Sequence, residues 1–353
     1  MNLEELGWSE FFQKQLTQNY THLIPARVVR QDLTGYLLFS GKGPLTGSLP
    51  GKFRHDITSK ADLPSVGDWV LVTLLTDEPE KAVISKLMNR RSQFSRREAG
   101  EQLDQQIIAA NIDTAFIVSG LDANFNVQSI ERYLLLAWES DATPYILLNK
   151  ADTCSNLGER VSSVRLVAPD VGISAISALT GQGIERLRDR IPKGETGALL
   201  GSSGVGKSTI INTLLGFERF QTRPVREGDS KGRHTTTFRE MAQIPGAGLL
   251  IDTPGMRELQ VWGDESSLAQ TFDDLEVLAH QCRFRDCSHV NEPGCAIKAA
   301  IESGDLDEDR LTSYSKLQRE LKHLSEQQQV KARTERKSER TRLSRAHRKR
   351  PGD

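Results

Sequence analysis

Two short stretches of the sequence carry residues that could bind a nucleotide, and they stand in an unusual order. Residues 201–208 read GSSGVGKS, which fits the phosphate-loop pattern G-x-x-x-x-G-K-[ST]. Residues 149–152 read NKAD, a pattern typical of loops that recognise guanine. In ordinary domains with both patterns the phosphate loop comes first, whereas here NKAD precedes it by about fifty residues. Either one match is accidental, or the domain is permuted.

The phosphate-loop stretch has the chemistry that nucleotide phosphates require. It follows an apolar strand and opens a helix, so backbone N–H groups and the positive end of the helix dipole meet at one point. Lys207 can reach the β- and γ-phosphates and assist catalysis, and Ser208 can bind Mg²⁺. The residues that we expect to contact the nucleotide here are Gly201, Ser202, Ser203, Gly204, Val205, Gly206, Lys207, Ser208 and Thr209.

NKAD lies at the end of the apolar run YILLNK and would recognise the base. Asp152 can accept hydrogen bonds from N1–H and the exocyclic amine of guanine, and adenine offers no such pair of donors. Asn149 would tie this loop to the phosphate loop, and the stem of Lys150 would cover the base. Ser177 and Ala178, in the motif SAL, can supply a backbone N–H to the guanine oxygen. The alternative for NKAD is a polar turn.

These stretches lie among alternating strand-like and helix-like segments from 104 to 262. Buried apolar strands between amphipathic helices predict a mostly parallel sheet with helices on both faces. Asp252 begins DTPG at the end of the strand GLLID, which places it at the same sheet edge, where it can hold Mg²⁺ through water. Ligands bind at strand ends wherever the chain begins, so both matches are compatible with a circularly permuted domain.

A group of cysteines and one histidine follows this region. The spacing is Cys282-x4-Cys287-x-His289-x5-Cys295. Three thiolates and one imidazole make a closed tetrahedral set for Zn²⁺, which predicts one structural ion and leaves no open position for catalysis. The alternative is a group of reduced cysteines that bind no metal.

The residues before the α/β region predict a second domain. Residues 23–88 contain short strand-like runs broken by Gly, Pro and Asp, which favour a small antiparallel barrel of the OB type. Such barrels often bind oligonucleotides, and a barrel without a ligand is an equal alternative. Residues 1–22 look like a helical lead-in. In the basic linker 89–103, four arginines surround Phe94, so we expect either an exposed linker or a contact with RNA in which Phe94 stacks on a base.

Charge and composition limit the partners and the compartment. The sequence has no run of 18 apolar residues, and its N-terminus lacks the features of a signal peptide, so we expect a cytoplasmic protein with no membrane partner. Residues 331–353 hold ten Lys or Arg and three Asp or Glu, although the formal net charge of the chain is only −1. A basic tail on an acidic body is typical of nucleic-acid binding, and a solvated tail without a partner is the alternative.

The C-terminal region divides into two parts. Residues 263–330 are expected to form a helical domain around the zinc, with Leu317, Leu321 and Leu324 as an apolar stripe that packs on it. Beyond 331 there are few apolar anchors, so we expect disorder until RNA binds.

The order NKAD, SAL, GSSGVGKS, KGRHTTT, DTPG, with a barrel before it and a Cys/His cluster after it, resembles the ribosome small subunit-dependent GTPase A family. The resemblance extends over nearly the whole chain and includes the spacing of the zinc motif. It implies a cytoplasmic GTPase that acts late in assembly of the bacterial small ribosomal subunit and binds ribosomal RNA.

The segment KGRHTTT (231–237) occupies the place of the first switch. By the resemblance, Thr236 completes the Mg²⁺ site, with Thr235 as the second choice. The residue after DTPG is Met256, where many GTPases have a glutamine that orients the attacking water. Intrinsic hydrolysis is therefore slow, or another group supplies this function. His234 is the nearest candidate, with Arg233 as a charge stabiliser, and a histidine without a catalytic role is the alternative.

We therefore expect a multidomain, monomeric enzyme that binds GTP and GDP with Mg²⁺, contains one Zn²⁺, and is stimulated by the small subunit and its rRNA. One alternative is a regulatory GTPase switch with a protein partner, and another is a passive RNA-binding module. The expected parts are a helical lead-in (1–22), an OB-type barrel (23–88), a basic linker (89–103), a circularly permuted α/β P-loop GTPase domain (104–262), a zinc-binding helical domain (263–330) and a basic tail (331–353).

Overall fold

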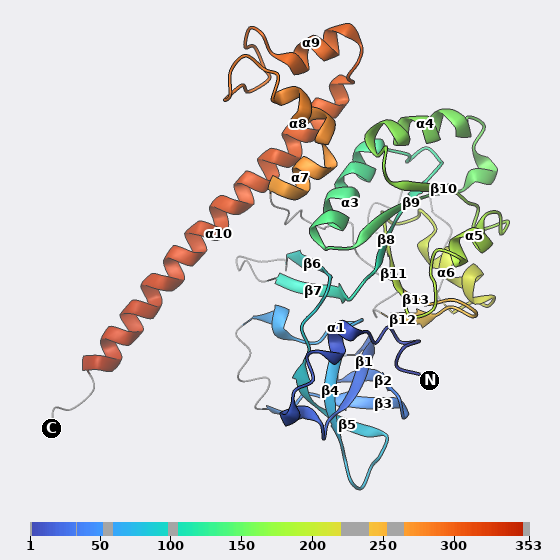
Figure 1. Cartoon of the computed structure of the whole chain (residues 1–353), viewed down its shortest axis with the longest axis vertical. Helices are drawn as coiled ribbons and strands as arrows, with labels where there is room; N and C mark the ends of the chain where they lie inside the picture. Colours follow the sequence, from blue (N-terminus) through green and yellow to red (C-terminus); the bar gives the residue numbers. More distant parts are fainter. Residues whose placement is uncertain are drawn as a thin grey trace. The chain divides into compact units, whose positions relative to one another are not determined.

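The structure is a computed structural model that forms two compact units (Figure 1). The first unit comprises Met1–Arg97 and Asp104–Gln260, and the second contains Val261–Asp353 together with Glu98–Leu103. None of the helices in the described ranges combines the length and apolarity needed to cross a bilayer. The residues that the structure describes are 2–32, 34–51, 59–97, 105–219, 240–252 and 265–348.

The predicted barrel is present near the N-terminus of the first unit. Its strands are β1 (Ile24–Gln31), β2 (Tyr36–Ser40), β3 (Gly43–Ser48), β4 (Trp69–Leu74) and β5 (Lys81–Leu87). They pair in the order β1-β2-β3-β5-β4 and close through β4 and β1. All these pairs are antiparallel except β3 with β5, which is parallel. Alternate residues such as Val28, Leu38 and Ile84 fill the interior and are fully buried, which explains why the runs had strand-like spacing.

The residues before the barrel contain only short helical pieces. These are α1 (Glu10–Gln13) and a 3₁₀ turn at Gln18–Tyr20. Phe12 and Leu6 are buried with Trp69 of β4, and the Trp8 ring meets the Trp69 ring edge-on at 4.8 Å. The lead-in is therefore held to the barrel by aromatic packing rather than by a long helix.

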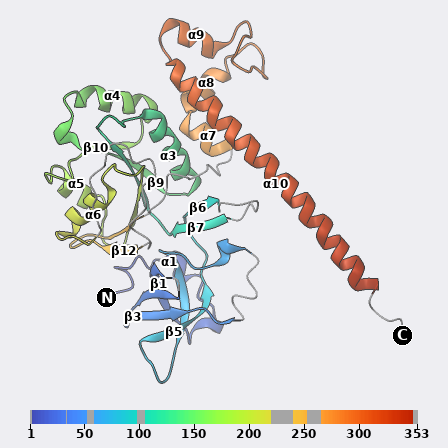
Figure 2. The same ribbon diagram turned by 180° about the vertical axis from the view of Figure 1, so that it is seen from behind.

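The α/β part of the first unit is built on parallel strands. The strand order is β10 (Gly172–Ala175), β9 (Thr143–Asn149), β8 (Thr114–Gly120), β11 (Thr196–Leu200), β13 (Leu249–Asp252) and β12 (Glu240–Gln243). Only β12 runs antiparallel to its neighbour β13. β12 also pairs with β1 of the barrel at Arg30 and Glu240, so the barrel and the α/β strands form one continuous sheet (Figure 2).

Helices cover both faces of this sheet, as predicted. On one face α3 (Val127–Glu139) and α4 (Leu157–Val167) enclose a core that includes Ile130, Leu134 and Val164. On the other face α5 (Ile184–Arg188) and α6 (Lys207–Leu215) enclose a second core. α3 begins where the side chain of Asn126 accepts a hydrogen bond from the Ser129 N–H at 3.0 Å.

The described part of the expected basic linker contains one strand of a hairpin, and the role predicted for Phe94 was wrong. β6 (Gln93–Arg97) pairs with β7 (Gln105–Ala110). Phe94 is only 2 % exposed and belongs to the same hydrophobic core as Ile130 and Leu134 of α3, so it cannot stack on a base. The polar residues around Phe94 suggested exposure, but Arg90 is one of them and its guanidinium is largely buried. It donates two hydrogen bonds of 2.8 Å to the carboxylate of Asp68.

A buried arginine joins the barrel to the α/β part. Arg27 of β1 is 1 % exposed and donates hydrogen bonds to the carbonyl oxygens of Leu6, Gly67 and Asn111. The side-chain nitrogen of Asn111 also donates a hydrogen bond to the Gly67 carbonyl oxygen, at 3.0 Å. Because a buried guanidinium without acceptors is costly, these bonds fix the lead-in, the barrel and the α/β part in one arrangement.

The second unit is helical. Its helices are α7 (Glu265–Thr271), α8 (Asp273–Ala279), α9 (Ala296–Ser303) and α10 (Glu308–Arg348). Leu317, Leu321 and Leu324 of α10 are buried, so the predicted apolar stripe exists. Arg310 of α10 pairs with Asp274 of α8 at 2.8 Å.

The structure differs from the prediction at the tail, because α10 remains helical to Arg348. The prediction of disorder was based on the lack of apolar residues. Such a lack weakens tertiary packing but does not prevent helix formation. Lys, Arg, Glu and Ala make up twelve of the eighteen residues 331–348, and all four are good helix formers.

Candidate nucleotide site and metal centre

The predicted nucleotide-binding residues gather at one edge of the α/β sheet. β8, β9, β10, β11 and β13 are parallel, so their carboxyl ends lie at the same edge. Register pairs such as Gly120 with Asn149 and Leu199 with Asp252 bring these ends level. This edge is where open α/β sheets bind their ligands, and the sheet brings the segments together although their order along the chain is permuted.

The phosphate loop connects β11 to α6 and has the backbone that only glycine allows. Gly206 has a φ of +99°, and a Cβ there would lie 2.3 Å from the Asn149 side-chain nitrogen. A Cβ at Gly201 would lie 2.4 Å from the Val118 carbonyl oxygen. Lys207 opens α6, and its ammonium donates to the carbonyl oxygens of Gly201 and Ser202 at 2.7 and 2.9 Å. The ammonium therefore lies over the loop, where an anion would replace these carbonyls as its partner.

Asn149 links three segments of the edge, as the sequence predicted for the link to the phosphate loop. It is 3 % exposed. Its side-chain nitrogen donates to the Val205 carbonyl at 2.8 Å, and its side-chain oxygen accepts the N–H of Ala178 at 3.0 Å. The Ala178 N–H is thus already bonded within the protein. The expectation that an N–H of Ser177 or Ala178 binds the guanine oxygen stays a prediction.

The remaining NKAD residues differ in their surroundings. Lys150 has a left-handed backbone, with φ +67°, and its ammonium lies 2.6 Å from a carboxylate oxygen of Asp122. Asp152 is exposed, and within the described part of the chain no hydrogen bond or ion pair engages its carboxylate. Asp122 was missed from the sequence; the only signal for it is its position two residues after the apolar strand β8.

Asp252 is the described residue of DTPG. It ends β13, is 3 % exposed, and faces the phosphate-loop lysine closely enough for their charges to interact. Burial raises the pKa of its carboxyl group, and the positive charge of Lys207 opposes this rise. A cation bound at this edge would stabilise the carboxylate further. Arg233, His234, Thr235, Thr236 and Met256 lie outside the described residues.

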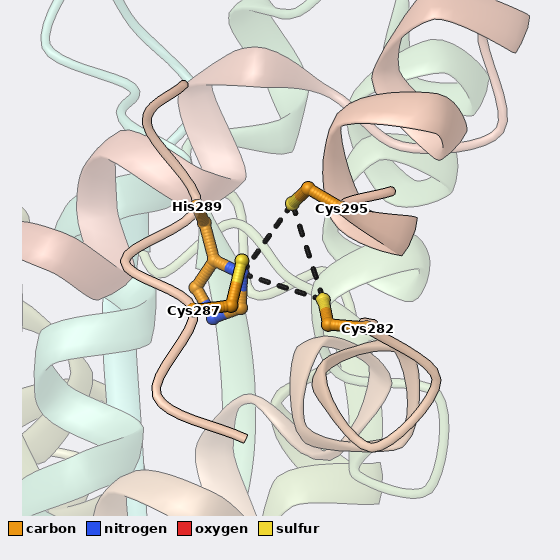
Figure 3. Close-up of side chains that lie close together, drawn as sticks. All are labelled: Cys282, Cys287, His289 and Cys295. Carbon is orange, nitrogen blue, oxygen red and sulfur yellow. Dashed lines mark hydrogen bonds between the residues drawn. The ribbon is translucent and has the colours of Figure 1, made fainter. Parts of the chain in front are cut away.

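The cysteines and the histidine of the second unit come together as predicted (Figure 3). Cys282 follows α8, Cys295 precedes α9, and Cys287 and His289 come from the loop between them. Their potential ligand atoms all lie within 4.8 Å of one another, so the cluster could bind a metal ion. Burial and the neighbouring thiols raise the pKa of Cys287 to about 11, whereas at Cys282 the opposing effect of burial is outweighed by hydrogen bonds from the backbone at Ala296 and Ile297, which lower the pKa of that thiol. A bound cation would stabilise the thiolate form of Cys287.

Glu292 organises the loop that carries His289. Its carboxylate accepts hydrogen bonds from the N–H groups of Ser288, Val290 and Asn291 at 3.0 to 3.1 Å, and from the Ser288 hydroxyl. His289 itself has a φ of +60°, which is uncommon outside glycine. The hydrogen bonds on both sides of His289 hold this backbone in place.

Two family models match the chain, and together they cover both the nucleotide site and the metal cluster. A model described as RsgA GTPase matches residues 87–262, and one described as 50S ribosome-binding GTPase matches residues 196–332. The second match begins at the strand before the phosphate loop, where an unpermuted domain would begin.

Curated relatives and solved structures match most of the chain. A protein of Opitutus terrae named small ribosomal subunit biogenesis GTPase RsgA is 44 % identical over 332 residues, which are 91 % of this chain and 90 % of that one. The crystal structure of YjeQ from Thermotoga maritima covers 85 % of this chain and 98 % of its own, at 26 % identity and a TM-score of 0.62. That of YloQ, described as a circularly permuted GTPase, covers 87 % and 98 % at 22 % identity, with a TM-score of 0.60.

The permuted strand order, the assembled sheet edge and the match over nine tenths of a curated relative agree with one another. This chain therefore belongs to the RsgA GTPase family and is a circularly permuted GTP hydrolase.

Proposed function

We propose that this protein hydrolyses GTP during late maturation of the bacterial small (30S) ribosomal subunit, binds its rRNA, and is stimulated by the subunit. The observation that carries the nucleotide chemistry is the sheet edge at which Lys207, Asp252 and Asn149 meet, although Asn149 and Asp252 are far apart in the sequence. The small subunit is proposed as the partner because the relatives are named small ribosomal subunit biogenesis GTPases.

Asp152 selects guanine in this proposal. Its exposed carboxylate lies one turn after the Asn149 that binds the phosphate loop, and it is available for the two guanine donors. Asp152→Asn should weaken GDP binding and favour xanthosine diphosphate, because an amide nitrogen can donate to the C2 carbonyl of xanthine. Titration calorimetry with both nucleotides measures the change, and unchanged GDP affinity in this variant would rule the assignment out.

Mg²⁺ accompanies the nucleotide in this proposal. Ser208 is the second residue of α6, directly after Lys207, and Asp252 ends β13, which pairs with the strand that leads into the phosphate loop. A hydroxyl and a carboxylate are therefore carried by neighbouring segments of the same sheet edge. Thr236 is the proposed third group. His234 is the proposed group that orients water in place of the glutamine that Met256 replaces, because imidazole can accept a proton near neutral pH.

The metal of the second unit is proposed to be one structural Zn²⁺. Bonds of about 2.3 Å to sulfur and about 2.0–2.1 Å to nitrogen give a tetrahedron with edges of about 3.6–3.8 Å. Nδ1 of His289 lies 3.5 Å from the Cys295 sulfur and 3.7 Å from the Cys282 sulfur, and these two sulfurs lie 4.0 Å apart. The residues fit the ion, and four protein ligands leave no position for a substrate.

Two parts of the chain are proposed to contact RNA. The barrel has the OB arrangement that often binds oligonucleotides, and the C-terminal half of α10 carries most of the ten Lys and Arg of residues 331–353. Eighteen helical residues from 331 to 348 extend about 27 Å at 1.5 Å per residue. Such an arm could place positive charge along several phosphates, and its affinity would fall steeply with salt.

Sedimentation with purified ribosomal subunits tests the proposed partner. With a non-hydrolysable GTP analogue present, the full chain should sediment with small subunits and show a strong inverse dependence on salt. Because one matching model is described as 50S ribosome-binding, large subunits are the essential comparison. Binding to large subunits alone would contradict the proposal. Weak salt dependence would favour the alternative of a regulatory switch that recognises a protein.

A further inference from the structure

An ion pair that the sequence did not suggest lies beside the base-recognition motif. The Lys150 ammonium and the Asp122 carboxylate are 2.6 Å apart, and each side chain is 29 % exposed. Lys150 directly follows β9 and Asp122 lies two residues after β8, so the pair joins the segments that leave two neighbouring strands. A partly shielded pair at this distance is a charge-assisted hydrogen bond rather than a loose surface contact.

The position of Asp122 is itself fixed. The Leu121 N–H donates to the Asn149 carbonyl at 2.8 Å, which ties the end of β8 to NKAD. The Asn124 N–H donates to Oδ1 of Asp122 at 3.0 Å, while Oδ2 receives Lys150. A Cβ at Gly120 would lie only 3.3 Å from Oδ1. Each carboxylate oxygen therefore has its own partner, and the carboxylate has little freedom to turn.

The ion pair restrains a side chain that would otherwise be free to rotate. Lysine has four rotatable bonds, and fixing them costs conformational entropy. The left-handed backbone of Lys150 sets where its stem begins, and Asp122 sets where its ammonium ends. The stem therefore reaches from the residue after β9 to the segment after β8 before any nucleotide binds, so binding does not have to order it.

We propose that Asp122 is a positioning residue that holds the Lys150 stem in the pose that covers the base. This inference rests on the proposed role of Lys150 at the base. Because the stem is apolar and the base is common to both nucleotides, loss of Asp122 should weaken GDP and GTP by the same factor. It should leave the preference for guanine over xanthine unchanged, since that preference belongs to Asp152.

A double-mutant cycle on the full chain tests the inference. GDP and GTP-analogue affinities are measured by titration calorimetry for the wild type, Asp122→Asn, Lys150→Met and the double variant. Asp122→Asn should weaken both nucleotides roughly fivefold to tenfold, which is within the net contribution of one intramolecular hydrogen bond. Lys150→Met should weaken them at least as much. Adding Asp122→Asn to Lys150→Met should then change nothing, because methionine has no charge for Asp122 to hold.

Controls separate positioning from folding. Asp170→Asn removes an exposed carboxylate from the turn between α4 and β10 and should not change affinity. Asp122→Glu keeps the charge and should restore part of the loss. Circular dichroism of each variant reports whether the fold is intact.

Three results would overturn the inference. Asp122→Asn could leave affinity unchanged while Lys150→Met reduces it, or it could reduce affinity by the same factor in both backgrounds; in these cases Lys150 keeps its role and Asp122 has another. If Lys150→Met itself leaves affinity unchanged, the proposed role of Lys150 fails, and the inference fails with it.

Discussion

Replacing Phe94 by alanine distinguishes the structure from the most natural interpretation of its sequence. The ring is 2 % exposed in the core shared by the β6–β7 hairpin and α3. An aromatic side chain buries about 150–250 Å², which at about 25 cal/mol per Å² is worth about 4–6 kcal/mol. Observed costs of Phe→Ala in protein cores are about 3–5 kcal/mol. The two estimates overlap, so we expect Phe94→Ala to lower the free energy of unfolding of the first unit by about 4 kcal/mol.

Differential scanning calorimetry can detect a loss of this size. For a unit of this length each kcal/mol lowers Tm by about 2–4 °C, so Phe94→Ala should lower the transition of the first unit by roughly 10 °C. Phe217→Ala is the matched control, because Phe217 is 57 % exposed, and its Tm should stay near that of the wild type. An unchanged Tm for Phe94→Ala, together with weaker RNA binding, would refute the structural assignment and support stacking on a base.

Other substitutions test the remaining sites. Lys207→Ala should abolish phosphate release from GTP, because it removes the ammonium over the phosphate loop; measurable turnover at the wild-type rate would contradict this role. Zinc should co-purify at about one ion per chain, and Cys287→Ser should lose it and unfold the second unit while the first keeps its transition; fresh protein without zinc would show that the metal is misassigned. Glu292→Gln should weaken zinc about 10–100-fold in competition with a chelator, because the loop carrying His289 loses hydrogen bonds. Glu302→Gln, an exposed change on α9, is its control, and equal zinc affinity of both variants would deny Glu292 a positioning role. Arg90→Met should destabilise the first unit by about 3–5 kcal/mol in denaturant unfolding, because it leaves the buried Asp68 carboxylate without its partner.

The architecture was predictable because its signals are local and repeated. The barrel follows from strand-like runs whose alternate residues, such as Val28 and Leu38, point inward. The permuted α/β domain follows from motifs that each end a strand, since parallel strands bring their carboxyl ends to one edge whatever the chain order. The metal cluster follows from spacing alone.

The errors and omissions in the first unit concern residues whose environment is set by distant partners. The local sequence of Arg90 predicts an exposed linker residue. Its burial depends on the ion pair with the buried Asp68, which lies twenty-two residues away in the sequence. Phe94, four residues later, is likewise buried in the core. Asp122 acquires a role only because β8 and β9 are neighbours and Lys150 reaches across. In the tail, the absence of apolar anchors indicated disorder, whereas the helix propensity of the same residues is satisfied without them.

Turnover of GTP with and without purified small ribosomal subunits tests the central claim most directly. Met256 stands where a water-orienting glutamine is common, so the isolated chain should hydrolyse GTP slowly, and small subunits should accelerate it strongly. Large subunits at the same concentration should have little effect. Rapid hydrolysis by the isolated chain, or a slow rate that small subunits leave unchanged, would contradict the account.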